Sequence, residues 1–451
     1  MSTQKKAITN MGALVIVQIL NYLLPIVTIP IIVRIIGPSN FGSINYISSI
    51  VAYFVLFIGY SFELSASRSI AMNLGNQAKL NRIFSKVLFT KIFLFIVSTI
   101  IFTGLIFYSE NLKNDLLLSI YTYLVCVASI FDCNYFYTAK QDLKQVALFN
   151  LIAKVVLNLS FLYFIRQKND YILQPLLISI SQIVVGVGSF YWAIRLYTLK
   201  IIFPGLKAIY RMIWEDKILF FHSFAHTVYT TINIIFLGYF STLAEVGFYT
   251  AGWKLIILIQ ALLISPLGVV LFPIIGQAFG NSKADGIAII QKMIPIIIFS
   301  TLAIAFGILI LGGFTVRIFY GDKFLESILI FKILAFMPMM LALNMLFGIQ
   351  AMVNLKMDKK FFLITLSAAL INIILNLGLI KYLGSPGAAI SWFLTETYCA
   401  VAMFTILTKS NIHLFKSEYF TFEVLSANLL MVKDKIRDKL KKTDKQHKEN
   451  N

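Results

Sequence analysis

The chain has 451 residues, of which 59% are hydrophobic and only 13% are charged, and its mean hydropathy is +0.83. Soluble domains carry about 45–50% apolar and about 25% charged residues, so this composition excludes a water-soluble globule. The formal charge is +19, from 39 Lys and Arg against 20 Asp and Glu. In a membrane protein, an excess of Lys and Arg sets which loops lie on the cytoplasmic side. We therefore expect this protein to contact membrane lipids and not nucleic acid.

Long apolar runs bounded by Gly, Pro or charged clusters predict the membrane spans. About 20 apolar residues cross the hydrocarbon core as a helix, so a span with its connection takes about 35 residues. The expected spans lie near residues 11–36, 42–65, 84–108, 114–138, 145–165, 171–194, 218–240, 246–275, 290–313, 327–353, 361–380 and 386–408. The predicted fold class is therefore an all-α integral membrane protein with about twelve transmembrane helices.

Lys and Arg are distributed unequally between the two sets of loops. Outside the spans, 28 of them lie in the tails and in the loops on the side of the termini, whereas the opposite loops hold six. Basic residues accumulate in cytoplasmic loops. We therefore expect both termini in the cytoplasm.

A weak internal repeat suggests two halves. Asn158 and Asn376 stand in similar motifs 218 residues apart, and Gly42 and Gly247 stand 205 residues apart. Two parallel six-helix repeats fit both offsets, and transporters with such repeats bind substrate at the repeat interface. The expected division is an N-terminal lobe with its following linker at 1–210, a C-terminal lobe at 211–408 and a basic cytoplasmic tail at 409–451.

The first helix of each half carries polar side chains at helical spacing. They are Gln18, Asn21 and Thr28, with Pro25, in the first helix, and His222, His226, Thr230 and Asn233 in the seventh. Polar atoms that face lipid lack partners, so such stripes face the bundle interior or water. We expect them to line a shared central cavity and to contact substrate. The alternative is hydrogen bonding between helices in a closed bundle.

Metal and enzyme signatures are weak. His222 and His226 have the spacing of a zinc-binding helix, but Ser223 stands where a metalloprotease needs its Glu. The three cysteines lie in apolar runs without a CxxC motif or a His at ligand spacing. No nucleotide-binding loop or nucleophile elbow is present, and the outer loops are short. We expect no metal, no cofactor and no enzymatic activity.

Five cations lie within the expected spans, and a charge at mid-membrane costs about 2.5–3.5 kcal/mol on insertion scales. Lys154 and Lys254 lie deep, so we expect them to face water or an anionic substrate; internal salt bridges are the alternative. Arg34, Lys91 and Lys332 lie closer to a membrane face. For these three, binding of an anionic substrate and snorkelling to the headgroups are equally good interpretations.

Three acids are also embedded: Glu63, Asp132 and Glu396. A carboxyl group in a low-dielectric cavity can exchange a proton or hold Na⁺. We consider all three as ion-coupling candidates, with pairing to an embedded lysine as the alternative. For Asp132, which lies near Asn134 and Lys140, a structural role is favoured.

Several motifs resemble one transporter family. They are residues 33–46 (VRIIGPSNFGSINY), 60–70 (YSFELSASRSI), 83–91 (IFSKVLFTK), 372–377 (NIILNL) and 384–391 (GSPGAAIS), followed by Thr395 and Glu396. They resemble Wzx-type flippases of lipid-linked oligosaccharides, in the polysaccharide-exporter branch of the multidrug/oligosaccharidyl-lipid/polysaccharide superfamily. In that family Arg34, Arg68, Lys91 and Lys154 stand at positions that are usually basic. Residues 131–136 (FDCNYF) depart from the family's aromatic-Gln-Gly ending of the fourth span.

The resemblance implies two six-helix lobes around a central cationic cavity, in a multi-pass protein of the bacterial plasma (inner) membrane. The implied substrate is an undecaprenyl-pyrophosphate-linked repeat unit of O-antigen, capsule or a related polysaccharide. It would move to the outer leaflet by alternating access coupled to H⁺ or Na⁺. The implied partners are this polyprenyl-linked oligosaccharide, a polysaccharide polymerase and a chain-length regulator.

Two other functions stay open. A multidrug or cation antiporter of the same superfamily would need an acidic cavity, whereas embedded cations here outnumber embedded acids by five to three. A membrane-embedded polysaccharide polymerase or glycosyltransferase would need larger outer loops than this chain has.

Overall fold

The computed structural model describes residues 3–421, except for the side chains of 3–23, 25, 143–146, 222, 226, 229 and 269. All secondary-structure elements of this described part are helices. These residues hold ten helical stretches, several of them made of consecutive elements, that are long and apolar enough to cross a membrane, and residues 230–240 at the end of α10 form a shorter apolar stretch. The all-helical membrane fold is thus confirmed, and the number of twelve spans stays a prediction.

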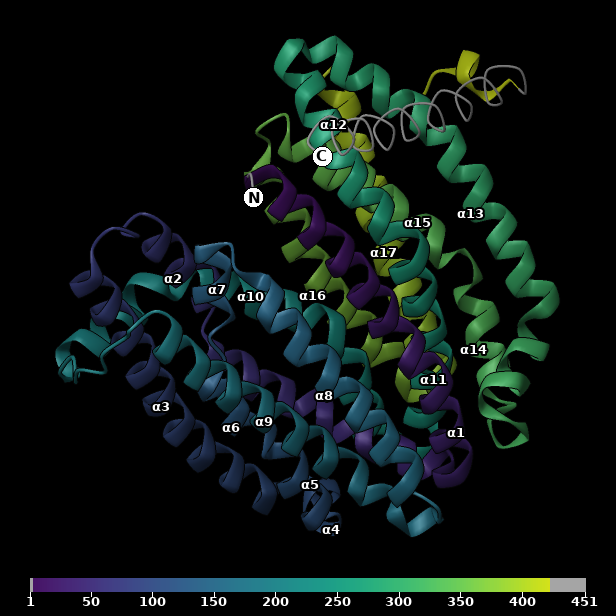
Figure 1. Cartoon of the computed structure of the whole chain (residues 1–451). Helices are drawn as coiled ribbons and strands as arrows, with labels where there is room; N and C mark the ends of the chain where they lie inside the picture. Colours follow the sequence, from purple (N-terminus) through teal and green to yellow (C-terminus); the bar gives the residue numbers. More distant parts are fainter. Residues whose placement is uncertain (1–2, 422–451) are drawn as a thin grey trace. The chain divides into compact units, whose positions relative to one another are not determined.

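The chain divides into two compact units, residues 1–247 with 319–323, and residues 248–318 with 324–451. The N-terminal unit holds α1 (Thr3–Gly59), α2 (Phe62–Ala71), α3 (Gln77–Tyr108), α4 (Glu110–Asn114), α5 (Leu116–Tyr123), α6 (Val125–Phe131), α7 (Asn134–Lys140), α8 (Leu143–Phe164), the 3₁₀ turn η1 (Lys168–Ile172), α9 (Leu173–Leu196) and α10 (Leu206–Phe240). Within it α8 and α9 run side by side, and α1 packs on α8 (Figure 1).

The C-terminal unit begins within α11 (Leu243–Ile259). It continues through the π-helical turn η2 (Gln260–Ile264), α12 (Ser265–Asn281), α13 (Lys283–Tyr320), the 3₁₀ turn η3 (Asp322–Phe324), α14 (Ser327–Ile333), the 3₁₀ turn η4 (Leu334–Phe336), α15 (Met337–Asn344), the π-helix η5 (Met345–Val353), α16 (Asp358–Leu383), α17 (Ser385–Lys409) and the 3₁₀ turn η6 (Ser417–Phe420), except that residues 319–323, at the end of α13 and in η3, belong to the N-terminal unit. Its helix pair α16 and α17 packs closely over most of its length.

Two expected spans meet inside α1. Gly37 has φ 79°, a left-handed conformation that glycine adopts without a Cβ penalty, and Pro38 follows it. Proline suits the first position of a helix because its missing N–H would have no intrahelical partner there. The Gly-Pro pair therefore ends one helical segment and starts the next, as the sequence predicts.

The second segment of α1 makes a reciprocal contact with the start of α11. A Cβ on Gly42 would lie 1.7 Å from the carbonyl oxygen of Leu243, and a Cβ on Gly247 would lie 2.1 Å from that of Pro38. Leu243 and Pro38 are 205 residues apart, as are Gly247 and Gly42. Gly42 thus packs against the residue four positions before Gly247, and Gly247 packs against the residue four positions before Gly42. Only glycine fits at either position, because a Cβ would overlap the facing carbonyl oxygen.

The expected fourth span is broken. It forms α5, α6 and α7, and the main break lies at Asp132 and Cys133, between α6 and α7. Asp132 takes an extended conformation with φ −62° and ψ 118°. The last carbonyls of a helix have no intrahelical donor, so a break inside the membrane needs another donor nearby.

Candidate functional site

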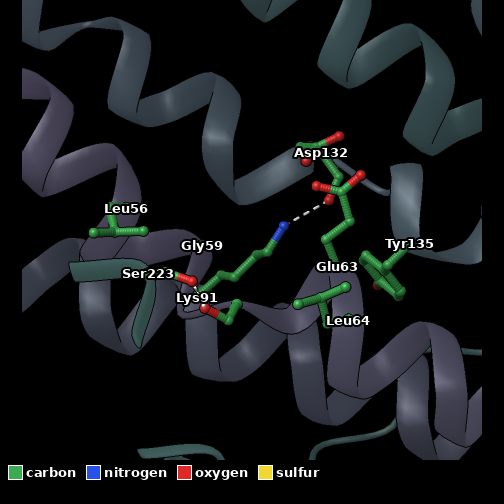
Figure 2. A pocket seen from close by; sticks show the side chains of 9 residues that line it. Leu56, Gly59, Glu63, Leu64, Lys91, Asp132, Tyr135 and Ser223 are labelled. Carbon is green, nitrogen blue, oxygen red and sulfur yellow. Dashed lines mark hydrogen bonds between the residues drawn. The ribbon is translucent and has the colours of Figure 1, made fainter. Parts of the chain in front are cut away.

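A cavity lined in part by charged side chains lies in the N-terminal unit, with a volume of about 240 Å³. Its lining comes from α1, α2, α3, α7, α10 and the break between α6 and α7, and Figure 2 shows the side chains. The lining residues are Leu56, Gly59, Ser61, Glu63, Leu64, Lys91, Asp132, Tyr135 and Ser223. It therefore joins three charged groups that the sequence singles out separately, Glu63, Lys91 and Asp132.

Lys91 supplies the donor that the broken span needs. Its side chain is 3% exposed, and its Nζ donates a hydrogen bond of 2.6 Å to the backbone carbonyl of Asp132. The same ammonium lies 5.4 Å from the ring centroid of Tyr135. An ammonium at a helix C-terminus is stabilised by the helix dipole and by the charge-assisted hydrogen bond. Lys91 thus bridges α3 to the end of α6.

The two carboxylates of the cavity have different surroundings. Glu63 is exposed and lies in the first turn of α2, where the helix dipole favours a negative charge. Asp132 is half-buried, and its Oδ1 accepts a hydrogen bond of 3.2 Å from the backbone N–H of Asn134. In Figure 2 the Lys91 side chain extends toward both acids. One ammonium and two carboxylates give the cavity a net negative charge when all three are ionised.

A sharp turn between α1 and α2 places Glu63. Tyr60 and Ser61 both have positive φ, 44° and 59°, which is unusual for residues with a side chain. The Ser61 hydroxyl is 2.8 Å from that of Ser223 and donates to the carbonyl of Leu219, which ties the turn to α10. Strained backbone of this kind persists where the surrounding contacts hold it.

A second contact fastens α2 to α10 next to the cavity. The Ser65 hydroxyl donates a hydrogen bond of 2.7 Å to Oδ2 of Asp216. Burial raises the pKa of the Asp216 carboxyl, the neighbouring Glu215 raises it further, and the Ser65 hydrogen bond opposes both effects. This carboxylate lies before the apolar part of α10 and is therefore sensitive to the pH outside the bilayer.

A second polar cluster lies in the C-terminal unit around Glu396. This residue is 5% exposed; its Oε2 accepts a hydrogen bond of 2.6 Å from the Asn344 amide, and its Oε1 accepts one from the Trp392 indole. The buried amide of Asn372 on α16 donates to the hydroxyl of Thr395, the residue before Glu396. The Glu396 carboxylate is thus held by α15 and α17.

Thr28 and Asn158 connect the first and fifth expected spans. The Thr28 hydroxyl hydrogen-bonds Oδ1 of Asn158, and the Asn158 amide donates a bond of 2.6 Å to the carbonyl of Lys154. The Lys154 side chain is half-buried, and among the residues that the structure describes its ammonium has no ion-pair or hydrogen-bond partner. Thr28 thus contributes to packing between helices.

Of the other expected site residues whose side chains are described, none lines the cavity. Arg34 and Lys332 are exposed, Lys254 is half-buried on α11, and Asn233 is buried on α10. The side chains of Gln18, Asn21, His222 and His226 lie outside the described residues. Where side chains are described, no group of three or more His, Cys, Asp or Glu could hold a metal ion.

Sequence reasoning missed several members of the two clusters. Ser61 and Ser223 carry no sequence signal, because their contact depends on the positive φ of the turn. Tyr135 is one of many aromatic residues in apolar runs. Asn344 did offer a signal, since an amide in the middle of an apolar run needs a partner.

The family is decided by a match over more than half of the chain. Residues 7–279 match the family described as "Polysaccharide biosynthesis protein". The chain belongs to this family.

Two curated relatives are each named "Putative O-antigen transporter". The one from Escherichia coli (strain K12) is 26% identical over 416 residues, which cover 91% of this chain and 99% of the relative. The one from Shigella dysenteriae is 24% identical over 397 residues, which cover 87% of this chain and 98% of the relative.

Solved structures of low sequence identity share the fold of this family member. A lipid II flippase MurJ in the inward closed conformation superposes with a TM-score of 0.71 at 13% identity and covers 94% of this chain and 91% of its own. An inward-facing multidrug resistance transporter of the MATE family superposes with a TM-score of 0.66 at 15% identity. This match covers 90% of the present chain and 98% of the transporter chain. The chain therefore belongs to the polysaccharide biosynthesis family and has the helical fold of these membrane proteins, with ten stretches among its described residues that are long and apolar enough to cross a membrane.

Proposed function

We propose that the protein moves undecaprenyl-pyrophosphate-linked oligosaccharide repeat units from the cytoplasmic to the outer leaflet of the bacterial plasma membrane. These units would serve O-antigen, capsule or related polysaccharide synthesis, together with a polymerase and a chain-length regulator. The observation that carries the proposal is the half-buried ammonium of Lys154, which has no partner among the described residues and lies in a helical stretch apolar enough to cross a membrane. The family match and the relatives named as O-antigen transporters support it.

Physical chemistry explains why such a substrate needs a protein. A pyrophosphate and its sugars lose strong hydration in hydrocarbon, which costs tens of kcal/mol for an isolated ion, whereas the polyprenyl chain is stable in lipid. A passage for the headgroup therefore needs cations and hydrogen-bond donors. We assign this role to Lys154, whose half-buried ammonium has no partner among the described residues. Arg34, Lys254 and Lys332 are further candidates.

We assign ion coupling to the cavity of Glu63, Lys91 and Asp132. Two carboxylates next to one ammonium favour binding of H⁺ or Na⁺, because a bound cation balances the excess negative charge. Loss of that cation would strengthen the attraction of both acids for Lys91 and so pull α2 and the end of α6 toward α3. Glu396 is a second coupling candidate, held on the buried cluster of the C-terminal unit.

The same cavity gives one specific argument for the rival function. An excess of carboxylates suits an organic cation, so a multidrug or cation antiporter remains the second candidate. The two functions differ in their substrates. A flippase moves a lipid-linked oligosaccharide and is not inhibited by organic cations, whereas an antiporter binds such cations in competition with protons.

The test uses the purified full chain in vesicles that carry a fluorescent polyprenyl-pyrophosphate oligosaccharide. Appearance of the sugar on the opposite leaflet is measured under imposed pH or Na⁺ gradients. We expect translocation that falls at least tenfold in Lys154→Ala, less in Lys154→Arg, and not in Lys113→Ala, an exposed lysine at the end of α4. Glu63→Gln should remove the response to the gradient. Translocation that ignores both gradients would exclude coupling, and transport of an organic cation in place of the oligosaccharide would exclude the flippase.

A further inference from the structure

The first turns of α10 carry an exposed apolar stripe. Residues four positions apart lie on one side of a helix. The stripe consists of Leu206, Tyr210, Trp214 and Ile218, which are 72%, 67%, 59% and 75% exposed. It precedes the apolar stretch 230–240, in a helix of 35 residues. At 1.5 Å per residue this helix is about 52 Å long, well beyond the 30 Å of hydrocarbon, so its first part lies outside the bilayer core.

Basic side chains accompany this stripe. Lys207 and Arg211 are exposed and each follows a stripe residue directly, and the Lys217 ammonium lies 3.3 Å from the ring centroid of Trp214. Glu215 is the one exposed acid of this segment, because Asp216 turns to Ser65. The surface therefore combines apolar and aromatic side chains with an excess of positive charge.

The preceding loop is fixed in place on α3. The Gln77 amide donates to the carbonyl of Tyr197, the Lys200 N–H donates to Asn81, and the Ile202 N–H donates to the Ser85 hydroxyl. The loop presents three further exposed apolar side chains, Ile201, Ile202 and Phe203, which are 47%, 59% and 60% exposed. These hydrogen bonds keep the apolar side chains outward instead of letting the loop collapse on the unit.

We infer that this surface, residues 201–218, is a binding site for acidic phospholipids. Trp and Tyr prefer the interface between membrane and water, and basic side chains beside them attract anionic headgroups. Each basic residue near an anionic surface contributes roughly fivefold in lipid partitioning. The surface lies on the side that the distribution of Lys and Arg predicts to be cytoplasmic. The occupant is a membrane phospholipid, so the inference does not depend on the transported substrate.

The test uses Trp214 as the reporter in the full chain, reconstituted without any transport substrate. Vesicles contain equal amounts of phosphatidylglycerol and phosphatidylcholine, and one of the two lipids carries bromine on its acyl chains. Bromine quenches indole fluorescence on contact. The Trp214 contribution is the difference between the parent protein and Trp214→Phe. We expect brominated phosphatidylglycerol to quench it at least threefold more than brominated phosphatidylcholine.

A triple variant tests the charge argument. In Lys207→Gln, Arg211→Gln, Lys217→Gln the quenching ratio should fall to about one. A matched triple variant of exposed lysines in the C-terminal unit, Lys283→Gln, Lys359→Gln, Lys360→Gln, should keep the parent ratio. Equal quenching by both lipids in the parent protein would overturn the inference, as would an unchanged ratio in the first triple variant. Absence of quenching by either lipid would show that the surface is covered by something other than phospholipid.

Discussion

Replacing Lys91 by methionine tests the central contact of the cavity. Methionine keeps the length and flexibility of the side chain but removes the ammonium, so the Asp132 carbonyl loses its 2.6 Å donor. Hydrogen bonds to charged groups contribute about 1.5–3 kcal/mol, and the two acids of the cavity also lose the cation that balances them. The cost is reduced because the variant no longer buries an ammonium that is 3% exposed in the parent protein. We expect a net loss of about 2 kcal/mol.

The assay is thermal unfolding of the purified protein in detergent. For a domain of 150–250 residues, 1 kcal/mol shifts the melting temperature by about 2–4 °C, so Lys91→Met should melt roughly 4–8 °C lower. The control is Lys79→Met on the same helix, because Lys79 is exposed and should melt like the parent protein. Translocation should also fall at least tenfold in Lys91→Met.

A double variant separates charge balance from the hydrogen bond. If Lys91 balances the acids, Glu63→Gln in the Lys91→Met background should restore part of the lost stability, since the excess negative charge is removed. Additive effects of the two substitutions would assign the whole cost to the hydrogen bond. A Lys91→Met protein that melts and translocates like the parent would refute the reasoning.

Three further perturbations test the packing and the titration described above. Asn158→Leu removes one of the two acceptors of the buried Thr28 hydroxyl, which keeps the Leu24 carbonyl, and should lower the unfolding free energy by about 0.5–1.5 kcal/mol, measured by thermal unfolding. Gly247→Val should lower the unfolding free energy by about 1–3 kcal/mol through overpacking. Gly104→Val, where a Cβ meets open space, should lower it much less in the same assay, and equal losses of stability would contradict the reciprocal contact. Because the pKa of Asp216 is raised, the folded state binds the proton of this carboxyl more tightly than the unfolded state does. The parent protein should therefore lose stability relative to Asp216→Asn as the pH rises from about 4 through the raised pKa. A stability difference between these two proteins that does not change across a pH series would contradict that reasoning.

The positions of helices were largely predictable, because the bilayer allows few alternatives. Backbone groups in hydrocarbon must bond within their own segment, so every long apolar run becomes a helix. The Gly37–Pro38 boundary inside α1 follows from two residues with special backbone preferences. The break at Asp132 was not predicted as such, although the departure of residues 131–136 from the family pattern marked that place.

The candidate site was only partly predictable. Glu63, Lys91 and Asp132 were each conspicuous as charges in apolar surroundings, and this signal needs no structure. Their meeting in one cavity was not visible, since they come from two helices and from the break between two others. The sequence interpretation judged Lys91 by its depth and its family position, and neither could reveal the backbone carbonyl to which it donates in the structure.

The sequence by itself predicted a membrane protein and most of the apolar stretches that form its long helices, because hydrophobicity and the cost of unpaired backbone act locally along the chain. It also determined the family, through motifs that extend over most of its length. Only the tertiary structure decided which polar groups meet. A buried ammonium donates to whichever oxygen the packing brings within reach, and for Lys91 that oxygen is available only because a neighbouring helix ends at Asp132.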